Sequence, residues 1–115
     1  MKLETYIQNE FRSSDSLAAA GKYVAAFGHL ERAHVIGQAS TYQHTRVHLR
    51  MFKIGLKIGS LREIWGQLIR IIGALSKTPL GIYPKGNTGG ANVWFFRPMS
   101  VPEDLQEILN QAKLD

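Results

Sequence analysis

The residues of this chain that could do chemistry lie in one short stretch, His29 to His48, which reads HLERAHVIGQASTYQHTRVH. It contains all four histidines of the sequence and the carboxylate of Glu31. Imidazole nitrogens and carboxylate oxygens are donors with which proteins bind divalent transition metals. The clustering of these donors within one stretch therefore predicts a metal site.

The spacing of the donors suits two consecutive helices. One helical turn separates His44 from His48, so both imidazoles point to the same side. Glu31 and His34 form a Glu-x-x-His pair, an element from which helical bundles build metal sites. A hairpin turn near residues 38–39 would place His34 level with His44, and Glu31 level with His48, if the two helices run antiparallel. Four donors could then converge between facing helices.

We expect His34, His44 and His48 to be ligands, with Glu31 as the fourth ligand and His29, near the rim of its helix, as a weaker candidate. Three inward imidazoles need a partner to offset their loss of water, and a cation supplies one. The chain has no cysteine, which favours Fe, Mn, Zn, Ni or Cu(II) held by nitrogen and oxygen. Alternatively, the histidines lie on a helix–helix seam and hydrogen-bond to each other, to the backbone or to Glu31.

The bulk properties restrict the class of protein. A length of 115 residues fits one domain, residues 1–115, with its own hydrophobic core. The net charge of +5 allows contact with an anion, nucleic acid or an acidic membrane without requiring any of them. No run of about 18 apolar residues predicts a membrane span, and the first residues lack the apolar core of a signal peptide. We therefore expect a cytoplasmic protein.

The apolar pattern predicts an all-α fold of two antiparallel helical hairpins. The expected helices cover residues 3–19, as one helix or two short ones, then 21–36, 40–58 and 60–75. The third helix carries its histidines on the inward face and a basic stripe on the opposite face, made of Arg46, Arg50, Lys53 and Lys57. The fourth opens with Ser60 and Glu63 as a capping box, and we expect a core helix with a buried end.

From residue 21 the second helix follows the pattern Gly-x-Tyr-x-x-Ala-x-x-x-Leu-x-x-Ala. The stretch that begins 38 residues later, at Gly59, has apolar residues at the corresponding positions. This pattern resembles the second half of a tetratricopeptide (TPR) repeat, in which small residues let two helices cross closely. Two such units are too few for a solenoid. We therefore expect a compact TPR-like bundle over residues 1–76.

Residues 77–99 are rich in glycine and proline and have no helical period, which predicts an ordered loop. Its aromatic content indicates that it packs over the bundle, with room for a small-molecule ligand beneath it. Its Gly-Asn-Thr-Gly-Gly sequence could bind an anion through backbone N–H groups, although a tight turn explains the glycines as well. The candidate anion ligands are Lys85, Gly86, Asn87, Thr88, Gly89, Gly90 and Arg97. Residues 100–113 predict a C-terminal helix capped by Ser100.

Four motifs together resemble a known family. They are F-x-H-L-E-R-A-H-V-x-G-Q at 27–38, H-x-x-x-H at 44–48, G-N-T-G-G-A-N at 86–92 and F-R-P-M-x-x-P-E-D-L at 96–105. This combination resembles a family of small bacterial proteins defined as a domain of unknown function with an NTGG signature. The resemblance spans nearly the whole chain and implies no activity, substrate or cofactor. It does imply that the histidines and the glycine loop belong to one pattern, which suits a site where the loop covers the hairpin.

These observations predict a small metal-binding helical protein with a His/Glu site between facing helices. Such a site could be catalytic and activate water or dioxygen, with Glu31 as a ligand or a base, or it could serve metal storage or sensing. The alternative is a TPR-like interaction module that binds a peptide or nucleic acid through the basic stripe. A basic stripe is more often the solvated side of a helix, so nucleic acid is the less favoured partner.

Overall fold

The computed structural model describes residues 2–94 and 97–114, and over these residues it is helical, without a strand. The α-helices are α1 (Leu3–Ala19), α2 (Tyr23–Gly37), α3 (Thr41–Ile58), α4 (Leu61–Lys77) and α5 (Glu103–Leu114), with a 3-10 helix, η1 (Thr78–Leu80), directly after α4. The prediction of an all-α fold is confirmed. None of the helices in the described part of the chain has the length and apolar character that crossing a membrane requires.

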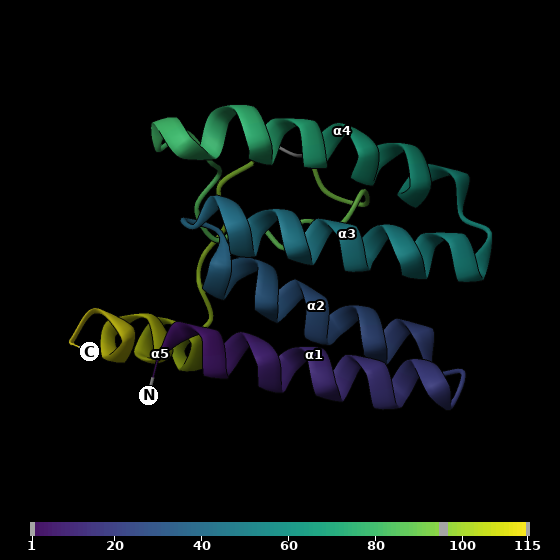
Figure 1. The fold of residues 1–115 in the computed structure, drawn as a ribbon, viewed down its shortest axis with the longest axis horizontal. Helices are drawn as coiled ribbons and strands as arrows, with labels where there is room; N and C mark the ends of the chain where they lie inside the picture. Colours follow the sequence, from purple (N-terminus) through teal and green to yellow (C-terminus); the bar gives the residue numbers. More distant parts are fainter. Residues whose placement is uncertain (1, 95–96, 115) are drawn as a thin grey trace.

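The first four helices lie side by side in chain order (Figure 1). Helix α1 packs on α2, α2 on α3, and α3 on α4, while α5 packs on α1 and α2. The α1–α2 and α3–α4 pairs form the two predicted hairpins, and a C-terminal helix is present as expected. As a result α1 and α4 lie at opposite edges of the row, and the segment between α4 and α5 returns along the row to reach α1 (Figure 1).

Serine caps start α3 and α4. The Oγ of Ser40 accepts a hydrogen bond from the N–H of Gln43 at 3.3 Å, and the Oγ of Ser60 accepts one from the N–H of Glu63 at 3.2 Å. Each bond satisfies an N–H group that the helix itself leaves without a partner. The predicted capping box is half right, because the carboxylate of Glu63 turns into the protein, where it accepts hydrogen bonds from Gln67 and from Ala91.

The first helix is a single helix, Leu3–Ala19, which is one of the two alternatives that the sequence left open. One predicted boundary needs correction. The last helix begins at Glu103 rather than Ser100. The N–H of Gln106 donates to the carbonyl of Pro102 at 2.9 Å, so the helical hydrogen bonds start only at this proline, which itself has no N–H to donate.

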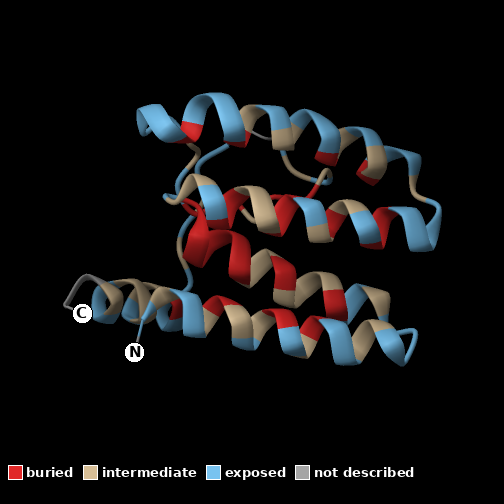
Figure 2. Ribbon diagram, viewed as in Figure 1, coloured by how far each residue is buried: buried red, intermediate tan, exposed pale blue. Residues whose placement is uncertain are grey.

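The hydrophobic core lies between α1, α2, α3 and α5. Its buried members are Ile7, Phe11, Ala26, Leu30, Ala33, Val35, Ile36, Val47, Met51, Ile54 and Leu105. None of them comes from α4. Figure 2 shows the same contrast: buried positions run through the middle of the row, whereas most of α4 is exposed or half-buried.

The prediction that α4 is a core helix with a buried end is therefore wrong. Its buried residues are Glu63, Gln67 and Ala74, whereas Ile69 and Ile72 are 54% and 66% exposed. Because α4 is the edge helix, only α3 and the loop that follows cover it. The side that it turns to them is largely polar, and its apolar side faces outward.

Candidate metal centre

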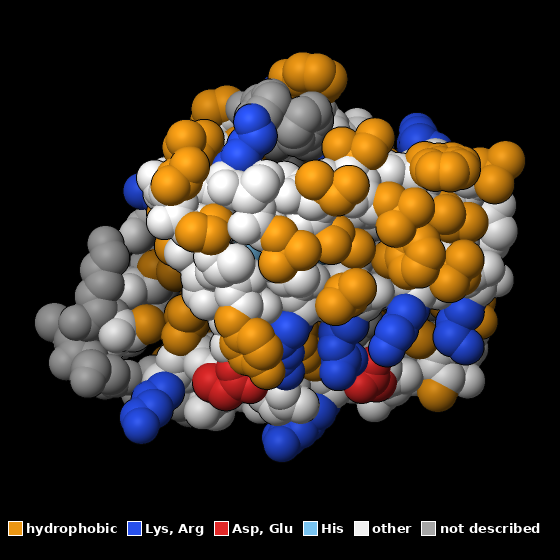
Figure 3. Space-filling model, turned by 45° about the horizontal axis from the view of Figure 1, so that its top comes forward, with side chains coloured by type: hydrophobic (Ala, Val, Ile, Leu, Met, Phe, Trp, Pro, Cys, Tyr) orange, Lys and Arg blue, Asp and Glu red, His pale blue; other side chains and the backbone are white. Residues whose placement is uncertain are grey.

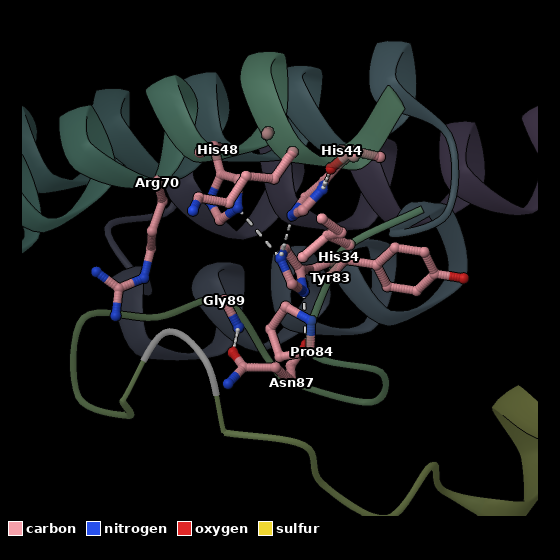
Figure 4. A pocket seen from close by; sticks show the side chains of 13 residues that line it. His34, His44, His48, Arg70, Tyr83, Pro84, Asn87 and Gly89 are labelled. Atoms are coloured by element: carbon pink, nitrogen blue, oxygen red, sulfur yellow. Dashed lines mark hydrogen bonds between the residues drawn. The ribbon is translucent and has the colours of Figure 1, made fainter. Parts of the chain in front are cut away.

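Three histidines converge in the space between α2, α3 and the loop after α4. His34 comes from the last turn of α2, and His44 and His48 come from the first half of α3, one turn apart. The Nε2 of His34 lies 3.0 Å from the Nε2 of His44 and 3.2 Å from the Nε2 of His48. The three rings offer ligand nitrogens that all lie within 4.8 Å of one another, and all three residues are buried (Figure 4). The predicted convergence of these three residues is confirmed.

The other ring nitrogen of each histidine has an oxygen partner. The Nδ1 of His34 lies 2.5 Å from the backbone carbonyl of Asn87, the Nδ1 of His44 lies 2.8 Å from the hydroxyl of Thr78, and the Nδ1 of His48 lies 2.6 Å from the Oε1 of Gln67. Asn87, Thr78 and Gln67 are buried as well. Contacts of this kind set the orientation of metal-binding imidazoles and the position of their proton.

These contacts determine which nitrogen carries the proton in two of the rings. A carbonyl oxygen can only accept, so the Nδ1 of His34 is the donor to Asn87. The amide of Gln67 has a defined orientation, because its Nε2 donates to the carboxylate of Glu63 and to the carbonyl of Gly89, both at 2.9 Å. Its Oε1 is then an acceptor for the Nδ1 of His48. The Nε2 atoms of both neutral rings consequently carry lone pairs and no proton.

The electrostatics keep the imidazoles neutral. Burial lowers the pKa of His34 well below the usual 6.5, and the neighbouring His48 and His44 lower it further. Burial also lowers the pKa of His44 to about 4 and, together with the charge of His44, that of His48 to about 3. Near neutral pH no proton therefore lies between the Nε2 atoms of His34 and His48, whose protons are on Nδ1. Two lone pairs face each other across 3.2 Å, which is unfavourable unless a cation lies between them.

The spacing of the nitrogens fits such a cation. Metal–nitrogen bonds of about 2.0–2.1 Å separate two ligand nitrogens by about 3.3 Å at a tetrahedral angle and by about 2.9 Å at a right angle. The observed 3.0 and 3.2 Å lie in this range. The three histidines therefore fit a metal ion in donor chemistry and in distance, and His34 and His48 fit it in protonation as well.

The glycine loop covers the site, as the family pattern implied. Gly89 has a φ of +85°, and a Cβ at this position would lie 2.5 Å from the Cδ2 of His34. Gly86 has a φ of +81°, and its Cβ would lie 1.9 Å from the carbonyl oxygen of Met99. Both positions need glycine for the backbone conformation and for the close approach. The loop can thus press its backbone onto the His34 ring.

Hydrogen bonds hold this loop in place. The N–H of Gly86 donates to Gln38, which also donates from its amide to the carbonyl of Pro84. The side chain of Asn87 donates to two loop carbonyls and accepts from the N–H of Gly89 at 2.8 Å. The N–H groups of Gly86, Asn87 and Gly89 thus have acceptors inside the protein. This arrangement is the tight turn that was the alternative explanation of the glycines, and anion binding by this loop stays a prediction.

A small cavity borders the histidines on the side of α4 and η1. Its volume is about 40 Å³, and besides the three histidines its walls include Arg70, Lys77 and Tyr83. A cavity of this size has room for a few water molecules. An ion held by the three Nε2 atoms would therefore lie next to this space.

Two predicted ligands lie elsewhere. Glu31 is outside the three-histidine group. Burial raises the pKa of its carboxyl group, opposed by a hydrogen bond from Thr88 and supported by the charge of Glu63. His29 is also outside the group and lies 3.4 Å from the carboxylate of Glu10. The position along α2 explains the outcome for His29, which is about 140° away from His34 around the helix. Glu31 is only about 60° away, but its carboxyl group is hydrogen-bonded to Thr88.

The basic stripe of α3 is partly neutralised by α1. The guanidinium of Arg46 lies 3.0 Å from the carboxylate of Glu4, and that of Arg50 lies 2.9 Å from the carboxylate of Asp15. Both guanidinium groups also lie over the ring of Phe11. Half of the stripe therefore serves the contact between α1 and α3, which reduces the charge that it could offer to nucleic acid or an acidic peptide.

Sequence reasoning missed two partners of the histidines, Gln67 and Thr78, and it assigned the third, Asn87, to anion binding. It also missed Glu63, which holds Gln67, and Gln38, which holds the glycine loop. One signal was present in the sequence. Glu63, Gln67 and Arg70 form a polar stripe at helical spacing on α4, opposite its apolar residues. Such a stripe in a helix at the edge of a bundle can face a polar site as well as solvent.

Comparison with known proteins adds a family and no function. No curated protein and no solved structure matches this chain significantly. The sequence profile of one family matches residues 1–109, and that family is described as a protein of unknown function (DUF3703). The match covers all three histidines, the glycine loop and most of α5, and the chain accordingly belongs to the DUF3703 family.

Proposed function

We propose that this protein binds one divalent transition-metal ion through the Nε2 atoms of His34, His44 and His48. The observation that carries the proposal is the convergence of three buried imidazole nitrogens whose distant ring nitrogens contact Asn87, Thr78 and Gln67. A helix seam that used its histidines as ordinary hydrogen-bonding groups would place donors against acceptors. In this site the Nε2 lone pairs of His34 and His48 face each other.

The surroundings of the histidines suit a positive ion. The Nδ1–H of His48 donates to Gln67, and Gln67 donates to the buried carboxylate of Glu63. This series of hydrogen bonds brings one negative charge, the carboxylate of Glu63, close to the site, and the carboxylate does not itself act as a ligand. A carboxylate behind a ligating imidazole raises the basicity of the ligand and typically improves metal affinity tenfold or more. Glu63 thus has the supporting role, whereas the prediction had assigned Glu31 to the site.

The donor set narrows the choice of metal. Three imidazoles without a thiolate or a carboxylate suit zinc, copper(II), nickel or iron better than manganese, which prefers oxygen donors. Three histidines with one open position are also a ligand set of catalytic zinc sites. We therefore rank Zn²⁺ first and Mn²⁺ last among the five metals that the sequence predicted.

The cavity beside the histidines supports an exchangeable fourth ligand. An ion held by three Nε2 atoms would expose one coordination position to this space, which has room for water or a small molecule. A metal in this position supplies Lewis-acid chemistry and lowers the pKa of bound water. The chain itself orients the ligands, and it lines this space with Tyr83 and Pro84 and with the basic residues Arg70 and Lys77. Glu31 is not in the histidine group, so we do not assign it as a base.

The test is metal stoichiometry in protein purified without an affinity tag. We expect about one ion per chain, and a visible d–d spectrum of four-coordinate geometry when Co²⁺ replaces the native ion. The His44→Ala, His48→Ala double variant should lose both signals. His29→Ala is the matched control, because this imidazole lies outside the group, and it should retain full binding. Substoichiometric metal in the wild type, or undiminished binding in the double variant, would exclude the proposal.

A further inference from the structure

Helix α4 turns an apolar stripe to the outside of the molecule. Leu61, Trp65, Leu68, Ile72 and Leu75 follow a spacing of four and three residues and lie on one side of the helix. They are 70%, 65%, 37%, 66% and 57% exposed, respectively. The opposite side of the same helix carries Glu63 and Gln67 toward the histidines. The usual amphipathic arrangement is thus inverted in α4.

The stripe continues onto α3. Tyr42, Leu49 and Leu56 are spaced by seven residues on the solvent side of α3 and are all exposed. Figure 3 shows hydrophobic side chains gathered into one broad patch over α4 and the adjoining side of α3, with a row of basic side chains along one edge. We call this surface the α3–α4 face. Its members are Tyr42, Leu49, Leu56, Leu61, Trp65, Leu68, Ile69, Ile72 and Leu75.

The extent of this face exceeds what an isolated small protein normally exposes. From their exposed fractions and ordinary side-chain areas, the nine residues expose on the order of 1,000 Å². The largest apolar patch on a typical monomer covers about 300–600 Å². A standard protein interface buries about 800 Å² on each partner. The area of the face therefore matches a stable interface and not an ordinary surface.

We propose that the α3–α4 face is the contact surface of a homodimer, in which a second copy of this chain covers it. Two antiparallel helices with apolar residues at four- and three-residue spacing present the pattern by which helices interdigitate in four-helix bundles. A two-fold axis through the face places the same pattern opposite itself, as the most common closed oligomer requires. All nine members of the face are uncharged, and they include Trp65 and Tyr42, aromatic residues of the kind that is enriched in protein interfaces.

The distribution of charge favours a second copy over a bilayer. A membrane-binding helix pair needs cations that reach anionic headgroups from the rim of its apolar face. Two of the four cations in the basic stripe, Arg46 and Arg50, are already paired with carboxylates of α1, and the guanidinium of Arg46 also lies over the ring of Tyr42. In a dimer the remaining rim cations, such as Lys53 and Lys57, stay in solvent, where they are exposed already.

The test is the oligomeric state of the full chain, measured by analytical ultracentrifugation and light scattering over a dilution series. The wild-type protein should have twice the chain mass of 12.9 kDa. Trp65→Glu and Ile72→Glu, examined separately, should each produce monomers with unchanged helical circular dichroism, because both side chains are exposed within the chain. Val24→Glu is the matched control. Val24 is 91% exposed on α2, outside the face, and this variant should remain dimeric.

Two results would overturn the proposal. One is a wild-type protein that is monomeric at every concentration, including a monomer that instead co-sediments with anionic phospholipid vesicles. The other is a dimer that persists in both glutamate variants while they keep the wild-type helical signal. Neither result would affect the proposed metal site, because the histidines lie on the opposite side of α4 from this face. The metal site is also tested by a different measurement, the metal content of the protein.

Discussion

The two helical hairpins of this protein have similar helices but are held together by different forces. The α1–α2 hairpin meets α3 and α5 through an apolar core that contains Ile7, Phe11, Ala26 and Leu30. Helix α4 meets α3 and the loop through buried polar groups, with Glu63 and Gln67 at the centre. Apolar burial therefore stabilises one half. A hydrogen-bond network next to the candidate metal centre positions the other.

This contrast indicates where the molecule can change state. Apolar packing stabilises a structure without regard to ligands or pH, whereas buried polar groups depend on their partners and protonation. We expect the α1, α2 and α5 region to be a constant scaffold. The α4 and loop region should respond to metal, to acid and, through the α3–α4 face, to the second copy.

The largest expected effect is that of acid on the metal-free protein. The pKa of His44 is lowered to about 4 and that of His48 to about 3, both chiefly by burial, and the pKa of His34 is lowered too. Above about pH 6.5 these groups are neutral in the folded and the unfolded chain. As the pH falls from 6.5 toward 4, only the unfolded chain takes up protons, so the free energy of unfolding decreases. The total loss is on the order of 5 kcal/mol.

Urea denaturation of metal-free protein at a series of pH values measures this loss. Hydrogen exchange at mildly acidic pH should show α4 and residues 78–94 losing protection before α1 and α2. Bound metal should shift the transition to lower pH, since the ion competes with protons for the same nitrogens. A free energy of unfolding that does not change between pH 6.5 and 4 would contradict the expected neutrality of the three imidazoles.

The second effect tests the apolar half. Phe11 is completely buried in the core, and Phe11→Ala should lower the free energy of unfolding by about 3–4 kcal/mol because it removes a large side chain and leaves a cavity. The loss should be the same with and without metal, since Phe11 lies outside the histidine cluster. Val24→Ala, at an exposed position, should change the stability by less than about 0.5 kcal/mol. A strongly metal-dependent loss at Phe11 would remove the distinction between the two halves.

The helices and the histidine cluster were predictable because local rules determine them. The helical period of the apolar residues located the first four helices, and the spacing of His44 and His48 required both to point the same way. The turn at residues 38–39 then brought His34 opposite to them. Each of these inferences uses positions close together in the sequence, where helix geometry alone decides the outcome.

The orientation of α4 could not be predicted by the same rules. A periodic stripe shows that Leu61, Trp65 and Ile72 share one side of the helix, but it does not show whether that side faces the core. The orientation depends on contacts of Glu63 and Gln67 with groups more than twenty residues away, in the glycine loop. The assignment of Glu31 to the site failed for a related reason. Helical spacing places Glu31 near His34, but it cannot show that Thr88 of the loop forms a hydrogen bond with its carboxyl group.

The smallest expected effect tests the link between the polar network and the metal, and it uses Glu63→Gln. The carboxylate of Glu63 accepts hydrogen bonds from the Nε2 of Gln67 and from the N–H of Ala91. A glutamine at position 63 has one acceptor oxygen for these two donors, and its NH₂ group needs an acceptor. The amide of Gln67 can rotate so that its Oε1 accepts from this NH₂ group. Its NH₂ group would then face the Nδ1 of His48. That ring must move its proton to Nε2, where it blocks the metal.

We therefore expect Glu63→Gln to weaken metal binding about 10–100-fold while the helical content is unchanged. Isothermal titration with Zn²⁺ or Co²⁺ measures the affinity, and Glu107→Gln, at an exposed position of α5, is the matched control. The double variant Glu63→Gln, Gln67→Glu should recover much of the lost affinity. It places a carboxylate directly against the Nδ1–H of His48, and a carboxylate can only accept. If Glu63→Gln binds metal as tightly as the wild type, the proton positions of the site do not depend on α4. If the double variant fails to recover, Glu63 acts on the fold of the loop and not on the His48 tautomer.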